Sequence, residues 1–141
     1  MTVRFLLDTN ALSEPMRPRP DPGVVRRMAE HAAEMAVAAP AYHELVFGIE
    51  RLPLSRRRLV LERYLEEAVH ASLPILPYDA TAARWHATER ARLTAIGRTP
   101  QYIDGQIAAI ARVNGLVLIT ANLSDYQDFA DVETADWRQE Y

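Results

Sequence analysis

The 141-residue sequence contains neither cysteine nor lysine. Without cysteine the chain has no disulfide, no thiolate nucleophile and no zinc site with sulfur ligands. Without lysine, every mechanism that needs a lysine side chain is excluded. Long apolar runs are also missing: no segment reaches the ~20 residues of a membrane span, and the N-terminal apolar run is too short for a signal peptide. We therefore expect a soluble, cytoplasmic protein with no membrane segment.

Arginine carries all of the positive charge, with 16 residues against 19 acids and a net charge of -3. A chain with this balance is not, as a whole, a basic nucleic-acid binder. A bias in genomic base composition explains the missing lysine, and the functional alternative is that arginine binds phosphate through two parallel hydrogen bonds. The basic cluster Arg56–Arg58 with Arg63, and the acidic stretch that ends the chain, are typical of solvated surface.

Short apolar segments alternate with helical patterns along the chain. We expect strands at about 3–7, 35–39, 75–76, 116–119 and 132–134, and helices at about 11–14, 22–33, 40–53, 55–71, 79–95 and 102–114. Asp21, Ser55 and Asp79 are expected N-caps, and Gly97 and Gly115 expected C-terminal stops. The order predicts a single domain over 1–141: a three-layer α/β/α fold with a central, mostly parallel sheet of four to five strands.

Acidic side chains follow the apolar segments or stand early in the helices. Asp8 follows the first apolar segment directly. Glu44 lies about one turn into the helix expected from 40, and Asp104 lies in the first turn of the helix expected from 102. Asn122 and Asp125 follow the segment at 116–119. Because ligands bind at the carboxyl ends of parallel strands, we expect these side chains to converge. Carboxylates that converge repel one another, and a hard divalent cation relieves this repulsion. The spacing predicts a Mg²⁺ or Mn²⁺ site.

Each acid also has a purely structural interpretation. Asp8 or Asn10 can cap the short helix at 11–14. Glu44 and Asp104 stand where the helix dipole favours negative charge. Asn122 can supply a neutral oxygen ligand, and Asp125 is either a ligand or the cap of a helix at 126–130.

Other catalytic classes lack their motifs in this sequence. The four histidines show no zinc spacing, and no serine lies in a G-x-S-x-G context. No G-x-G-x-x-G or P-loop occurs, which argues against dinucleotide or nucleoside triphosphate binding.

Taken in order, these segments resemble the PIN-domain family, and within it the VapC-type, FitB-like toxins of bacterial toxin–antitoxin pairs. The resemblance spans nearly the whole chain. It is carried by LLDTNALSE at 6–14, ELVFG at 44–48, DGQIAAIA at 104–111 and LITANLSDY at 118–126. Each motif alone is weak, and four of them in this order are specific.

The resemblance implies a Mg²⁺-dependent ribonuclease with Asp8, Glu44 and Asp104 as metal ligands. Thr120 belongs to the same site, and the hydroxyls of Thr9 and Thr120 could orient a carboxylate or a water. The family often has a fourth acid two residues after this threonine. Here that position is Asn122, so either Asn122 or the nearby Asp125 fills it.

The resemblance also implies a VapB-like antitoxin, which occupies the acidic pocket, and a homodimer. From the residues alone, some apolar positions should form an interface, whereas the usual fate of aromatic side chains is to turn inward. The positions are Tyr42, Val46, Phe47, Leu59, Tyr64 and Trp85.

Three other functions fit parts of the pattern. A receiver domain and a dehalogenase-like phosphatase also place acids at strand ends, but both need a lysine that this chain lacks. The remaining alternative is a PIN-fold module that binds RNA or protein with weak or no catalysis, and Asn122 is the feature that favours it.

Overall fold

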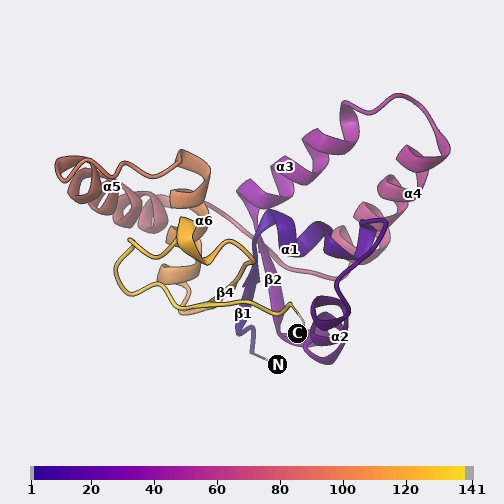
Figure 1. Cartoon of the computed structure of the whole chain (residues 1–141), viewed down its shortest axis with the longest axis horizontal. Helices are drawn as coiled ribbons and strands as arrows, with labels where there is room; N and C mark the ends of the chain where they lie inside the picture. Colours follow the sequence, from indigo (N-terminus) through magenta and orange to yellow (C-terminus); the bar gives the residue numbers. More distant parts are fainter. Residues whose placement is uncertain (1, 139–141) are drawn as a thin grey trace.

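The computed structural model describes residues 2–138, which form one five-stranded sheet with helices on both faces (Figure 1). The strands are β1 (Phe5–Leu7), β2 (Met35–Ala38), β3 (Ile75–Leu76), β4 (Val117–Ile119) and β5 (Thr134–Ala135). The α-helices are α1 (Thr9–Ser13), α2 (Pro22–Glu30), α3 (Ala39–Glu50), α4 (Arg56–Tyr64), α5 (Ala80–Ala95) and α6 (Tyr102–Val113). Short 3-10 turns lie at Glu14–Met16, Ala32–Glu34 and Leu123–Asp125, and a π-helical segment, Leu65–His70, continues α4.

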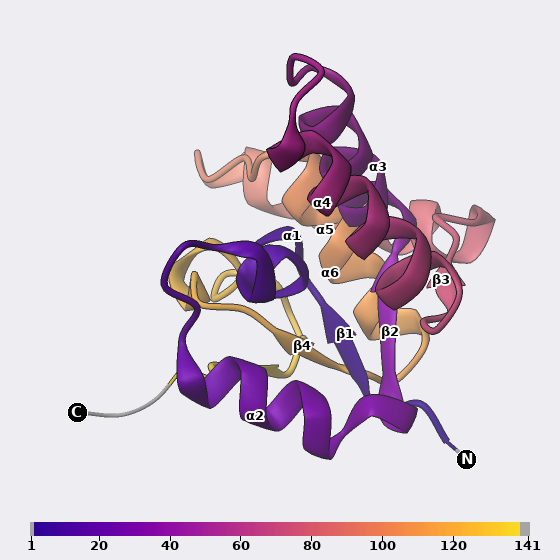
Figure 2. The same cartoon turned by 90° about the vertical axis from the view of Figure 1, so that its right-hand side faces the viewer.

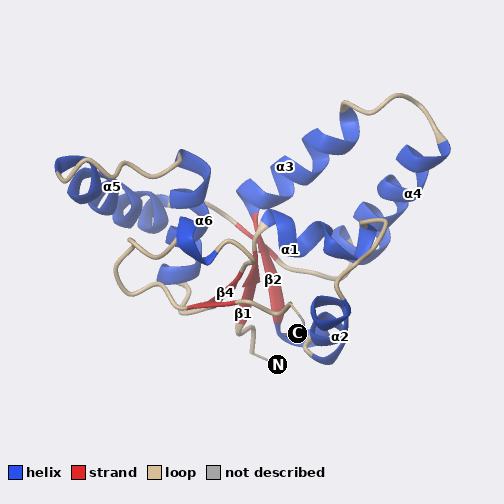
Figure 3. Cartoon of the chain, viewed as in Figure 1, coloured by secondary structure: helices blue, strands red, loops and turns tan. Residues whose placement is uncertain are grey.

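The sheet is parallel throughout, with strand order β3-β2-β1-β4-β5. Helices α5 and α6 lie on one side of it, and α1, α2 and α4 on the other (Figures 1 and 2). Helices and loops separate each strand from the next along the chain (Figure 3). The predicted three-layer α/β/α fold is confirmed.

The core is built on the three central strands, whose residues are buried on both faces. Leu6, Leu7 and Val37 have no exposed surface, and Leu118 and Ile119 are equally enclosed. A parallel sheet covered by helices on both sides needs such continuous apolar strands. For this reason the strands are visible in the sequence as short apolar runs.

The predicted N-caps and the two predicted glycine stops are confirmed. Asp21, Ser55 and Asp79 each accept backbone N–H groups in the first turn of the following helix. Gly97 and Gly115 follow α5 and α6 with φ of 74° and 66°, a left-handed conformation that glycine adopts without steric cost.

Several boundaries differ from the expectation. Helix α1 begins at Thr9 rather than 11, because Asp8 itself is the cap. Helix α2 ends at Glu30 rather than near 33, because the backbone at His31 leaves the helical region and a 3-10 turn leads into β2. The last strand lies one to two residues later than predicted.

The helix considered at 126–130 is absent, and the interpretation of Asp125 as its cap is wrong. Asp125 instead ends the 3-10 turn Leu123–Asp125. The following residues form tight turns that bury Tyr126 and Phe129, and the backbone N–H of Ala130 donates to the Glu89 carboxylate.

The expected interface positions divide into two groups. Tyr42, Val46, Tyr64 and Trp85 pack against the core, so for them the inward interpretation was right. Phe47 and Leu59 are 58% and 66% exposed. Leu54 and Val60, which were not predicted, are exposed beside them on the α3–α4 hairpin. Within the described residues, no helix combines the length and apolarity needed to cross a membrane.

Candidate active site

The sheet register brings the predicted acids to one edge of the sheet. Leu7 pairs with Val37 on one side and Ile119 on the other, so the chain leaves β1, β2 and β4 at the same level. A cavity of about 210 Å³ opens there. Five predicted site residues line this acidic cavity, and they come from four segments: Asp8, Glu44, Asp104, Asn122 and Asp125.

Asp8 is the most enclosed of the acids, with 4% of its surface exposed. Its Oδ1 accepts the backbone N–H of Ala11 at 2.8 Å, so the carboxylate is also the cap of α1. Burial raises the pKa of Asp8, and a hydrogen bond from the Thr120 hydroxyl opposes this rise. The structural and functional interpretations of Asp8 are therefore compatible, because a single oxygen serves the cap.

Glu44 projects from α3 and is held by a neighbour on α1. The hydroxyl of Thr9 donates to Oε2 of Glu44 at 2.6 Å. Thr9 follows Asp8 directly, so this bond ties the loop after β1 to the helix after β2. It fixes one carboxylate oxygen of Glu44.

Asp104 gives the clearest electrostatic sign of convergence. Burial, followed by the negative charges of Asp125, Glu44 and Asp8, raises the pKa of Asp104 to about 6. A hydrogen bond with Tyr126 lowers it in part. Burial and the same acids raise the pKa of the Tyr126 hydroxyl, so it stays protonated and can donate.

Thr120, Asn122 and Asp125 lie on the loop after β4. Thr120 is buried, and its Oγ1 accepts the backbone N–H of Asn122 at 2.9 Å. Asn122 and Asp125 are both exposed at the mouth of the acidic cavity. Of the three other acids, Asp125 raises the pKa of Asp104 the most, so its charge acts directly on this site.

The donor set suits a hard divalent cation. It consists of carboxylate oxygens and one amide oxygen, which are the ligands that Mg²⁺ and Mn²⁺ prefer. Among residues 2–138, no three acidic or histidine side chains are already gathered closely enough to enclose an ion. Mg²⁺ does not require this, because it usually binds one or two carboxylates directly and keeps several waters. Burial is the main cause of the raised pKa of Asp104, and the neighbouring carboxylates add a repulsion that a cation would relieve.

Two neighbours of the site were not assigned from the sequence. Tyr126 forms a hydrogen bond with Asp104, although in the sequence it stands only as the last residue of the LITANLSDY segment. His86, from α5, lies against Gly105, where an added Cβ would stand 2.0 Å from its Nε2. The absence of a side chain at Gly105 permits this close approach, but the neighbouring sequence does not identify His86 as the partner.

Known proteins resemble this chain in sequence and in fold. The model of the PIN domain family matches residues 5–132. Toxin FitB of Neisseria gonorrhoeae is 32% identical over 86% of this chain and 90% of its own length. The tRNA(fMet)-specific endonuclease VapC of Shigella flexneri is 29% identical over 96% and 98%. The DNA-bound VapBC structure from Salmonella typhimurium superimposes with a TM-score of 0.84 at 27% identity, covering 96% of this chain and 98% of that one.

Proposed function

This chain belongs to the PIN domain family, and from that premise we propose that it is a metal-dependent endoribonuclease, the toxin of a VapBC-type toxin–antitoxin pair. The observation that carries the proposal is the convergence of Asp8, Glu44, Asp104 and Asp125, from four segments, on one cavity. The related proteins named as a VapC endonuclease and as toxin FitB support the reaction class and the toxin role. Cellular RNA is the proposed substrate, so the proposed compartment is the cytoplasm.

We propose Asp8, Glu44 and Asp104 as the residues that hold Mg²⁺, or Mn²⁺ in its place, with Asp125 or Asn122 at the fourth position. A metal bound there would lower the pKa of a coordinated water and neutralise charge on the phosphodiester. Thr120 fixes Asp8, and Thr9 fixes Glu44. Carboxylates held in this way lose little freedom when a ligand arrives, which is the main requirement of a preorganised site.

Arginines beside the acidic cavity are proposed to attract the RNA backbone. Thr9 and Glu44 also line a neighbouring groove that contains Arg51 and Arg57. Arg58, in contrast, pairs with Glu50 and Glu62 and has a structural role. The predicted basic cluster at 56–58 is therefore only partly available to a phosphate.

Two protein partners are proposed. The solved VapBC complex supports a cognate VapB-like antitoxin for this chain. The exposed apolar side chains on the α3–α4 hairpin are proposed to pair with a second copy of the chain. Light scattering of the purified protein over a dilution series tests the homodimer, and a monomeric mass at high micromolar concentration would refute it without affecting the nuclease assignment.

The function is tested by sequencing RNA ends in cells that express the protein without an antitoxin. The parent should generate new ends, and Asp104→Asn should generate none. Asp128→Asn is a matched control, because this exposed aspartate lies outside the acidic cavity and its carboxylate pairs with Arg98 at 3.4 Å on the surface. The same new ends from Asp104→Asn would refute the proposal. The alternative of a binding module predicts that Asp104→Asn leaves metal binding unchanged.

A further inference from the structure

A second, larger cavity adjoins the acidic one. Its volume is about 440 Å³, within the range of small-ligand pockets. It lies among helix α1, the loops that follow β4 and β5, and the loop that precedes α2. Asn10 and Asn122 line both cavities. A polymeric ligand that lies across these two residues would therefore enter both cavities.

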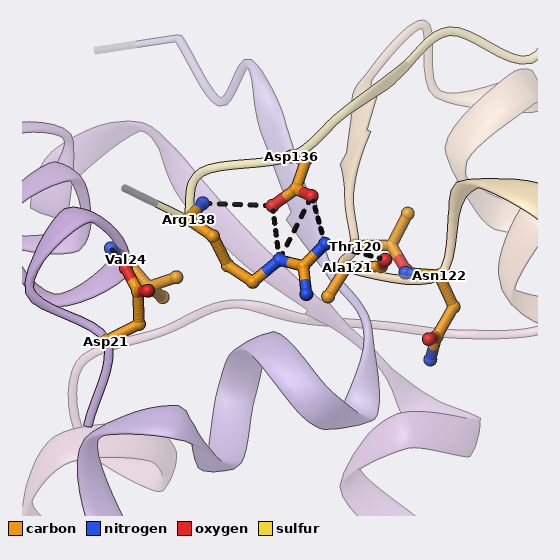
Figure 4. Close-up of polar contacts among 7 residues, drawn as sticks. All are labelled: Asp21, Val24, Thr120, Ala121, Asn122, Asp136 and Arg138. Carbon is orange, nitrogen blue, oxygen red and sulfur yellow. Dashed lines mark hydrogen bonds and ion pairs between the residues drawn. The ribbon is translucent and has the colours of Figure 1, made fainter. Parts of the chain in front are cut away.

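The walls of this second cavity are balanced in charge. Three arginines and three carboxylates line it: Arg17, Arg19, Arg138, Glu14, Asp21 and Asp136. Arg17 pairs with Glu14 at 2.9 Å, and Arg138 pairs with Asp136 at 2.7 Å (Figure 4). Paired in this way, the guanidinium groups do not supply the excess positive charge that an enclosed phosphate needs.

Part of the remaining wall is apolar. Ala11, Val24, Ile119 and Trp137 line it, with Trp137 7% and Ile119 1% exposed. Trp137 is held in place by a stacked contact with His31, with ring centroids 5.4 Å apart. Apolar walls combined with paired polar groups suit a flat, uncharged group that has hydrogen-bonding edges.

The residues between the two cavities have free hydrogen-bonding capacity. Across 2–138, the side-chain amides of Asn10 and Asn122 form no hydrogen bond with another residue. Each amide can donate and accept at once, which is how asparagine pairs with the edge of a nucleobase. Arg19 is exposed at the rim and has no ion pair within the described part of the chain.

We propose that the second cavity binds one unpaired nucleobase of the RNA strand, next to the phosphodiester that lies at the acids. Asn10 and Asn122 contact the edge of this base, and Arg19 contacts a phosphate outside the cavity. Sequence-specific recognition of RNA targets splayed, single-stranded bases of this kind. The inference rests on the proposed function, because it assigns part of the same substrate.

The two tryptophans of the protein, Trp137 and Trp85, provide NMR signals for a test. Trp137 lines the second cavity, whereas Trp85 packs against Phe129, with ring centroids 6.0 Å apart, and lines neither cavity. Asp104→Asn protein is titrated without divalent metal with the homotetranucleotides of A, C, G and U, and the indole N–H signals are followed by NMR. We expect at least one tetranucleotide to shift the Trp137 signal saturably and to leave Trp85 unchanged. An abasic tetranucleotide should not shift Trp137.

A variant that fills the cavity gives a second measurement. Ala121 lines the second cavity and is absent from the acidic one. Ala121→Leu should weaken binding of the best tetranucleotide by about tenfold, the scale of one bound base. Ala95→Leu, the same change at an exposed position that ends α5, should not weaken it.

The possible failures are distinguishable. RNA that binds with Trp137 unmoved, or an abasic strand that shifts Trp137 equally, overturns the base subsite and leaves the nuclease assignment intact. Tetranucleotides that do not bind at all also overturn the base subsite, whereas the nuclease assignment is decided by the RNA ends generated in cells.

Discussion

The hydroxyl of Thr9 donates a 2.6 Å hydrogen bond to Oε2 of Glu44, across 35 positions of sequence. Thr120 makes the corresponding contact with Asp8. Two of the proposed metal-binding carboxylates are thus each oriented by a threonine at the carboxyl edge of the sheet. The two threonines are not proposed as metal ligands, but they orient two of the carboxylates that are.

The first prediction concerns this orientation. Thr9→Val keeps the shape of the side chain but removes the donor, so Glu44 becomes free to turn away. Metal affinity and RNA cleavage should each fall by about 10–100-fold, the usual effect of losing a group that supports a ligand. Thr9→Ser, which keeps the hydroxyl, should stay near the parent. Equal calorimetric affinities for the valine and serine variants would show that the bond has no functional role.

The second prediction separates Asn122 from Asp125. Asp125 affects the pKa of Asp104 more than the other acids do, so Asp125→Asn should weaken binding of Mg²⁺ or Mn²⁺. Asn122→Asp should then matter little. The reverse pattern in calorimetric titration, tighter binding by Asn122→Asp and no effect of Asp125→Asn, would assign the position to Asn122. No change in either variant would exclude this loop from the site.

The third prediction concerns the packing beneath Asp104. A Cβ at Gly105 would stand 2.0 Å from His86 Nε2, and His86 is only 1% exposed. Gly105→Ala should therefore destabilise the protein by about 1–3 kcal/mol through overpacking, despite the ~1 kcal/mol by which alanine favours a helix. In a His86→Ala background the same change should be neutral or stabilising. Chemical denaturation of the four proteins measures this, and an equal loss in both backgrounds would disprove the contact.

The fourth prediction concerns pH. Burial, and then the charge of Arg90, lowers the pKa of His86 from its usual 6.5. The unfolded chain therefore binds a proton here more readily than the native one, so this residue makes unfolding easier as pH falls below about 6.5. The His86→Gln variant should lose this part of the pH dependence of the unfolding free energy. Asp104 acts in the opposite direction, since its pKa is raised. The quantity compared between parent and variant is therefore the slope of the unfolding free energy against pH.

His43→Gln, an exposed change on α3, is the control for this experiment. Unfolding free energies are measured from about pH 7.5 to 5.5, the interval in which the proton uptake of His86 differs between the two states. Parallel curves for the parent and His86→Gln would contradict the prediction.

Much of the fold was predictable because it follows from local chemistry. The apolar runs around Leu6, Val37 and Leu118 predict buried parallel strands, and caps such as Ser55 and Asp79 mark where helices begin. The convergence of the acids followed from the general geometry of parallel sheets. No long-range contact had to be known for these conclusions.

The remaining features depend on contacts between distant segments. The contact of His86 with Gly105 joins α5 to α6, and no local pattern marks the histidine as the partner. The turns at 126–130 replace a helix because Tyr126 and Phe129 are drawn into the core. The second cavity is formed by helix α1, the loops after β4 and β5, and the loop before α2. Neither its volume nor its charge balance can therefore be predicted from the sequence of any one segment.

The most direct test of the account is the rate of RNA cleavage by purified protein in Mg²⁺, for the parent, Asp8→Asn and Asp104→Asn. Asparagine at position 8 can still cap α1, and loss of a charge from a crowded acidic site relieves repulsion, so both variants should fold and unfold at or above the parental temperature. Both should lose cleavage, and chelation of the metal should abolish it in the parent. If either folded variant cleaves RNA at the parental rate, that carboxylate does not bind the metal and the proposed site is wrong.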